Sequence, residues 1–365
     1  MATINFIHNI YNESFDRPEL LKRLDIASNT QLLKISMIPF GSEGDPENYL
    51  GIRYTGNRIV EKIRDIGDTI SLYKLTHNIG HKNDQRIISG KFFIFKSLEF
   101  DNVYIAVTLE NSEFYHKELR SLLNGIYPEF LFAFIKSISL KQLIQEFSVV
   151  NSITEVKIKR ASQKIRFQDE RSMSAVTWPN MSLEDAFSFI QDNNGWFKSL
   201  QFEALKNGHT LSEIFIDRQG RVRTDRQFLI VYDGFIKPAC NLLNANYQLF
   251  SNRSRRHLEN LTPRPLLIDY PGDLFETVSV NEKFINAISQ LDKSSVSVVH
   301  GNPYIHMIVT DYNDGSSFDI WVLKHNQIII VPQMKGTVAG IKRLVNHIFD
   351  SFAEGEVKNY QLEAV

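Results

Sequence analysis

The chain has 365 residues, of which 43% are hydrophobic and 12% aromatic, and its formal net charge is -1. This length exceeds that at which one hydrophobic core usually stops growing, so two or three domains are expected. The hydrophobic content excludes an intrinsically disordered chain. The small net charge excludes a protein whose whole surface coats nucleic acid.

The first region, residues 1–150, is predicted to be an α/β region. Asp16 ahead of Pro18 predicts the start of a helix. Alternating apolar residues predict a strand at 31–38 and an antiparallel hairpin over 91–110.

The most apolar helical stretch, 129–144, is predicted to be a buried core helix. It is interrupted by Lys136, Ser137 and Ser139, and it is shorter than the roughly 20 residues that span a bilayer. The N-terminus lacks the basic start and apolar run of a signal peptide. We therefore expect no membrane partner.

The only cysteine, Cys240, points to a reducing compartment. A single cysteine excludes an intrachain disulfide framework and a cysteine-based zinc site. Because free cysteine is usually buried, we interpret Cys240 as a core residue rather than a nucleophile. The protein is expected to be cytoplasmic.

The middle region, 151–265, is predicted to contain a helix and a three-stranded meander. A capping box at Ser182 begins the helix. The meander turns at Asn207-Gly208 and again around Gly220, and Asn-Gly between alternating apolar residues is the strongest short hairpin signal. A proline-rich stretch at the end of this region marks a domain boundary.

The last region, 266–365, has the clearest pattern. Ser279 and Glu282 form an S-x-x-E capping box, four short strands follow, and 337–352 predicts an amphipathic helix. This order favours helices packed on one face of an antiparallel sheet. The predicted fold class is therefore α+β, with several domains built mainly from antiparallel sheets flanked by helices.

No sequence signature of a catalytic or cofactor site is present. The phosphate-loop, dinucleotide-binding, hydrolase-elbow and zinc-protease motifs are all missing, so we expect no cofactor and assign no catalytic residue. Two groups of possible metal ligands are interpreted as structural, because their spacing does not bring them to one face. These groups are His77, His81 and Asp84, and His300, His306 and Asp311.

A divergent metal-dependent nuclease or hydrolase is one alternative. Glu155 and Lys157 supply the Glu-x-Lys pattern on one strand face, which can hold a divalent ion beside an upstream carboxylate. Asp311 and Asp319 offer carboxylates in the last region, but Trp321 stands where a lysine is wanted. The pattern is short enough to arise by chance.

Basic residues are concentrated in the middle region. Residues 151–265 contain 17 Lys and Arg against 12 Asp and Glu, although the whole chain is slightly acidic. Arginine suits phosphate binding because its planar fork donates two parallel hydrogen bonds to one anion. The alternative is that these residues are solvated faces of strands and a hairpin tip. The three basic clusters are Lys157, Lys159, Lys164 and Arg166; Arg218, Arg221, Arg223 and Arg226; and Arg253, Arg255 and Arg256.

The function predicted from these observations is that of a cytoplasmic, non-catalytic accessory protein. Its middle domain would contact the backbone of DNA or RNA, which gives affinity without reading sequence. Besides the nuclease, a further alternative is a protein-interaction subunit of a larger assembly, whose basic surface meets an acidic partner.

Overall fold

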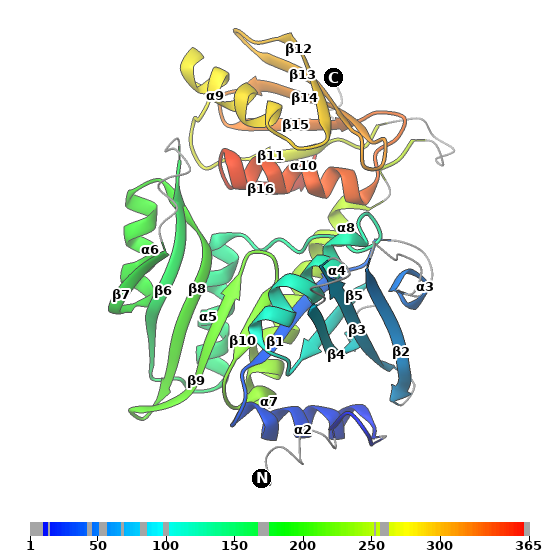
Figure 1. The fold of residues 1–365 in the computed structure, drawn as a ribbon. Helices are drawn as coiled ribbons and strands as arrows, with labels where there is room; N and C mark the ends of the chain where they lie inside the picture. The colour runs from blue at the N-terminus through cyan, green and yellow to red at the C-terminus, as the bar shows by residue number, and fades with distance from the viewer. Residues whose placement is uncertain are drawn as a thin grey trace. The chain divides into compact units, whose positions relative to one another are not determined.

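The computed structural model describes residues 10–13, 15–41, 46–50, 57–66, 69–80, 86–97, 102–166, 175–251, 253–255 and 263–360 (Figure 1). The chain forms two compact units: an N-terminal unit of residues 1–165 and 170–244, and a C-terminal unit of 166–169 and 245–365. Both contain helices and antiparallel sheet, which confirms the α+β class. Within the described ranges, no helix is long and apolar enough to cross a bilayer.

The N-terminal unit is built on a ten-stranded sheet with the order β2-β3-β4-β5-β1-β10-β9-β8-β6-β7. Each neighbouring pair is antiparallel. The strands are β1 (Leu33–Pro39), β2 (Arg58–Ile66), β3 (Ile70–Ile79), β4 (Arg86–Lys96), β5 (Val103–Thr108), β6 (Glu155–Ile165), β7 (Ala175–Ser182), β8 (Gly195–Lys206), β9 (His209–Asp217) and β10 (Arg221–Thr224).

Strand β1 joins the two halves of this sheet, because it pairs with β5 on one side and with β10 on the other. Residues before and after position 150 therefore share one sheet. The structure thus differs from the expected division into domains at 1–150, 151–265 and 266–365. The pairing of β1 with β10 connects segments nearly two hundred residues apart, and local patterns do not reveal it.

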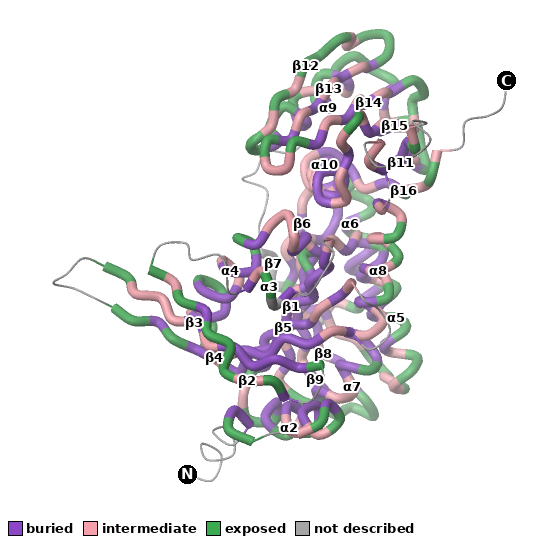
Figure 2. The backbone as a smooth tube through the Cα atoms, turned by 90° about the vertical axis from the view of Figure 1, so that its right-hand side faces the viewer, coloured by how far each residue is buried: buried purple, intermediate pink, exposed green. Residues whose placement is uncertain are grey.

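Helices cover the two faces of the sheet unequally. They are α2 (Arg17–Ser28), α3 (Glu47–Leu50), η1 (Phe114–Leu119), α4 (Arg120–Gly125), α5 (Ser137–Val150), α6 (Leu183–Asp192), α7 (Phe228–Val231), η3 (Tyr232–Ile236) and α8 (Lys237–Phe250). Residues of α2, α5, α6, α7 and α8, Cys240 among them, pack into the larger core. On the other face, η1 and α4 cover the β1–β5 part of the sheet and form a second core (Figure 2).

The segment predicted as a helix over 129–144 is helical only from Ser137 onward. The preceding residues form an extended strap, because tertiary hydrogen bonds hold their backbone. Leu131 N donates to Pro39 O at 2.8 Å, and Ile135 N donates to Arg218 O at 2.8 Å. The strap therefore lies along the end of β1 and the β9–β10 turn.

The predicted turns and the first capping box are present. Asn207, Gly208 and Gly220 have the positive φ angles of 53°, 79° and 70° that tight turns need. Ser182 Oγ accepts a hydrogen bond from Asp185 N at 3.1 Å, which is the N-cap half of a capping box.

The C-terminal unit contains a six-stranded antiparallel sheet with the order β12-β13-β14-β15-β11-β16. Its elements are β11 (Leu266–Asp269), α9 (Val278–Ser289), β12 (Ser294–His300), β13 (Ile305–Asp311), β14 (Ser317–Lys324), β15 (Gln327–Pro332), α10 (Val338–Ser351) and β16 (Glu356–Asn359). The predicted helix, four strands and helix all appear. Helix α9 is capped by Thr277 rather than Ser279.

A substitution at Gly220 can test how closely the strap approaches the β9–β10 turn. A Cβ at Gly220 would lie 2.9 Å from Ala133 Cβ, whereas one at Gly208 would have no neighbour within 4 Å. Both positions have positive φ, so Gly208→Ala is a matched control. We expect Gly220→Ala to lower the free energy of unfolding by about 1–3 kcal/mol more than the control does in urea denaturation. Equal losses would contradict the close approach.

Candidate anion-binding site

A line of directly opposed residues crosses the middle of the N-terminal sheet. Arg223 on β10 lies opposite Lys34 on β1 and opposite Phe215 on β9. Gln201 on β8 continues the line from Phe215 to Arg160 on β6. Directly opposed residues share one face of a sheet. We call Lys34, Arg223, Phe215, Gln201 and Arg160 the cationic row; its four strand spacings cover about 19 Å.

Lys34 and Arg223, the two neighbouring cations at one end of the row, are partly removed from water. Lys34 is only 4% exposed, and its ammonium donates to the carbonyl oxygens of Leu32 and Glu110 at 2.9 and 2.5 Å. Burial, and secondly the charge of Arg223, lowers the pKa of Lys34, while Glu110 opposes this shift. Burial likewise lowers the pKa of Arg223.

Arg223 is positioned by an aromatic ring rather than by an acid. Its guanidinium lies 4.1 Å from the centre of the Phe215 ring, a cation–π contact that leaves its N–H groups to other acceptors. Across the described part of the chain, Arg223 forms no ion pair, and its Nε has no hydrogen-bond partner. The guanidinium is thus held in place without being neutralised.

A pocket lies beside the row, and a second pair of basic side chains, Arg221 and Arg120, lines it. Arg221 is two residues along β10 from Arg223. Arg221 lies opposite Ser36 and forms an ion pair with Asp217. Asp217 also accepts hydrogen bonds from the backbone N of Gln219 and Arg221, at 2.9 and 3.1 Å. Burial raises the pKa of Asp217, whereas Arg221 opposes the rise.

Arg120 of α4 completes this group. Its pKa is lowered first by burial and then by the charge of Arg221, whereas the charge of Asp217 opposes the shift. None of the ion pairs found among described residues involves Arg120. Nearby, Ser36 Oγ lies 3.0 Å from the hydroxyl of Tyr115, which donates to Ile35 O at 2.9 Å.

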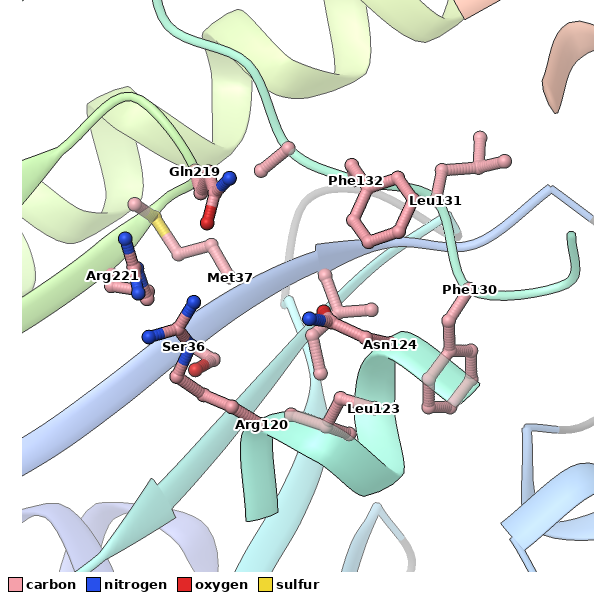
Figure 3. Close-up of a pocket in the computed structure, with 12 residues that line it drawn as sticks. Ser36, Met37, Arg120, Leu123, Asn124, Phe130, Leu131, Phe132, Gln219 and Arg221 are labelled. Carbon is pink, nitrogen blue, oxygen red and sulfur yellow. The ribbon is translucent and has the colours of Figure 1, made fainter. Parts of the chain in front are cut away.

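The pocket beside these residues has a polar side and an apolar side (Figure 3). It contains about 440 Å³ of empty space, part of which is open to solvent. The polar side chains are Ser36, Arg120, Asn124, Gln219 and Arg221. Phe130, Leu131 and Phe132 of the strap supply the apolar wall.

The basic residues exceed their acidic partners. Asp217 pairs with Arg221, and Glu110 offsets part of the charge of Lys34. The charge of Asp217 also opposes the lowering of the pKa of Arg120 and Arg223, but neither guanidinium forms an ion pair in the described ranges. An anion is the complement of such a site, because half-buried like charges repel strongly unless a counter-charge binds.

The sequence-predicted residues divide between this site and other roles. Arg221 and Arg223 belong to the site. Arg218 is buried with its guanidinium 4.2 Å from the centre of the Phe134 ring, and Arg226 is exposed and lies 3.3 Å from Asp225.

The predicted lysines lie on β6. Lys157 Nζ is 3.4 Å from Glu155 and Lys159 Nζ is 2.9 Å from Glu203, so both are ion-paired. Lys164 lies opposite Trp196, and Arg166 follows the strand at a turn.

The third predicted cluster lies in the C-terminal unit. Arg253 is buried and donates to the carbonyl oxygens of Leu249, Arg264 and Pro265 and to Asn359 Oδ1. Burial lowers its pKa to about 10. Arg255 donates to Gln333 Oε1 at 3.1 Å, and Arg256 lies outside the described residues. Arg253 therefore stabilises the segment that leads to β11, which is a structural role.

The possible metal ligands have other neighbours. His77 Nδ1 is 2.7 Å from Glu118, and His306 lies 3.1 Å from Asp319 with its ring stacked on Trp321. Asp311 pairs with Arg343 at 2.7 Å. His81 and Asp84 lie outside the described residues. Among those described, no three His, Cys, Asp or Glu side chains are grouped to hold a metal ion.

The comparisons with known proteins identify no relative. No family model and no curated protein matches the chain. A DnaN sliding clamp, DNA polymerase III subunit beta, from Bartonella birtlesii bound to griselimycin aligns over 82% of this chain and 99% of its own, with 7% identity and a TM-score of 0.10. The C. crescentus beta sliding clamp aligns over 83% and 99%, with 8% identity and a TM-score of 0.09. Similarity this low carries no argument about fold or function.

The pKa of the His116 side chain depends on the positive charge of the site. Burial, and then the charges of Arg120, Arg223, Arg221 and Lys34, lowers its pKa below the ordinary value of 6.5. We expect a pH titration by NMR, with the signal assigned through His116→Asn, to show this lowered pKa. The pKa should rise when inorganic phosphate is added, because a bound anion favours the protonated ring. An unshifted pKa that ignores phosphate would contradict the cluster.

Proposed function

We propose that this protein binds nucleic acid through its phosphate backbone, and that the cationic row makes the contact. The observation that supports this most strongly is Arg223, a half-buried guanidinium held by Phe215 and left without a carboxylate. The proposed role is that of a cytoplasmic accessory protein that binds rather than catalyses.

The chemistry of the row favours phosphate over other anions. A guanidinium with a fixed plane can donate two parallel hydrogen bonds to phosphate oxygens. Phe215 fixes that plane for Arg223, since the stacked position restricts rotation of the side chain. The exposed Arg160 adds a further donor on the same face, whereas the amide of Gln201 already donates to Glu213.

The extent of the row favours a polymer over an isolated ion. Lys34 is buried, so the accessible part of the row runs from Arg223 to Arg160, three strand spacings or about 14 Å. One strand of a nucleic-acid duplex advances about 3.4 Å per nucleotide, so this part spans about four nucleotides. Contacts of this kind position the backbone and do not read the bases.

The direct test is a binding titration with single- and double-stranded DNA and RNA at several salt concentrations. Wild type is compared with a variant that carries Arg160→Ala and Arg223→Ala. If both residues neutralise phosphates, the slope of log affinity against log salt on duplex DNA becomes shallower by about 2.

The control is Arg226→Ala, which removes one exposed charge just after the end of β10, where Asp225 already pairs with it. We expect its salt slope to equal that of wild type. A control that weakens binding as much as the row variant would place the contact beyond the end of β10 rather than on the row. If wild type does not bind any nucleic acid at low salt, the proposal fails and an acidic protein partner becomes the better hypothesis.

A further inference from the structure

We propose that the pocket beside the row binds the terminal phosphate monoester of a nucleic-acid strand. This inference rests on the proposed function, because the rest of the strand lies along the cationic row. Ser36 and Arg221 in the pocket are each two residues along their strands from Lys34 and Arg223 in the row. The two sites are therefore about 7 Å apart along the strand direction.

Among the described residues, the pocket offers a monoester one unpaired cation and several hydrogen-bond donors. A terminal phosphate carries about -1.5 to -2 charges at neutral pH and three unesterified oxygens, whereas a phosphodiester carries one charge. Arg120 forms no ion pair in the described chain, and the Nε of Arg221 is buried without a hydrogen-bond partner. Arg120 supplies a positive charge that is unpaired within the described ranges, and Arg221, although it is paired with Asp217, keeps a buried Nε that a phosphate oxygen can accept from.

Neutral donors surround the same space. The exposed amides of Asn124 and Gln219 and the hydroxyl of Ser36 line the pocket together with the two arginines (Figure 3). Each amide offers two N–H donors, whereas the hydroxyl proton of Ser36 is donated to Tyr115, whose own proton goes to Ile35 O. The oxygens of a phosphate can therefore be satisfied by side chains from α4, β10 and the β9–β10 turn.

The walls of the pocket favour the end of a strand. Strap residues from Phe130 to Ala133 line one side, and Arg120, Leu123 and Asn124 of α4 line another. A phosphodiester within a strand must leave the site in two directions, whereas a terminal phosphate is connected in one. Phe132 is half-buried at this wall and offers an aromatic surface to the terminal sugar or base.

The experiment compares 12-nucleotide DNA and RNA probes, as single strands and as duplexes, that differ only in their ends. One set carries a 5′-phosphate, one a 3′-phosphate and one hydroxyls at both ends. We expect one phosphorylated end to bind wild type at least about tenfold more tightly than the hydroxyl probe, the scale of one charged hydrogen bond. Fluorescence anisotropy at fixed salt gives the affinities.

Two variants connect this preference to the pocket. Arg120→Lys keeps the charge but loses the planar fork, and Asn124→Ala changes an exposed side chain at the end of α4. Both should reduce the preference for the phosphorylated end and leave the affinity for the hydroxyl probe unchanged. Arg226→Ala, outside the pocket, should keep the full preference.

The outcomes separate this inference from the proposed function. If all three ends bind wild type equally, the pocket does not hold a terminal phosphate, although backbone binding stands. If no probe binds, both proposals are overturned. Inorganic phosphate and a free mononucleotide are added as competitors; if they bind at the pocket while no oligonucleotide does, the ligand is a small phosphate and the strand-end assignment is wrong.

Discussion

The pairing of β1 with β10 is the constraint on which the rest of the N-terminal unit depends. It joins the two halves of the ten-stranded sheet and, by the same register, sets Lys34 directly opposite Arg223. Strand pairing and the packed core below hold these charges together although they repel each other. A fold that stabilises unpaired like charges in a half-buried site is prepared for an anion, since binding relieves the repulsion.

The sequence predicts the parts of the fold that depend on neighbouring residues. The Asn207-Gly208 turn, the capping box at Ser182 and the strands of the last region all arise from local chemistry. The strap before Ser137 does not, because its apolar residues suit a helix and only hydrogen bonds to Pro39 and Arg218 keep it extended. The division into compact units could not be predicted from local patterns for the same reason, because β1 pairs with β10, which lies far along the chain.

The site shows the same limit at the level of side chains. Clustered arginines pointed to Arg221 and Arg223, but Lys34 and Arg120 belong to other segments and join them only in the folded chain. One signal was available, because Lys34 and Ser36 are polar residues on alternate positions of an otherwise apolar strand. The basic neighbours of Arg253 suggested a phosphate-binding residue. Its hydrogen bonds to backbone carbonyls become visible only in the folded chain.

The most direct test of the account is the free energy of unfolding of wild type and Arg120→Met, measured with and without millimolar inorganic phosphate at constant ionic strength. Without phosphate the variant should be at least as stable as wild type, because an unpaired charge has been removed. Phosphate should stabilise wild type in proportion to site occupancy and the variant much less. Equal responses of the two proteins to phosphate would contradict the claim that these arginines form an anion site.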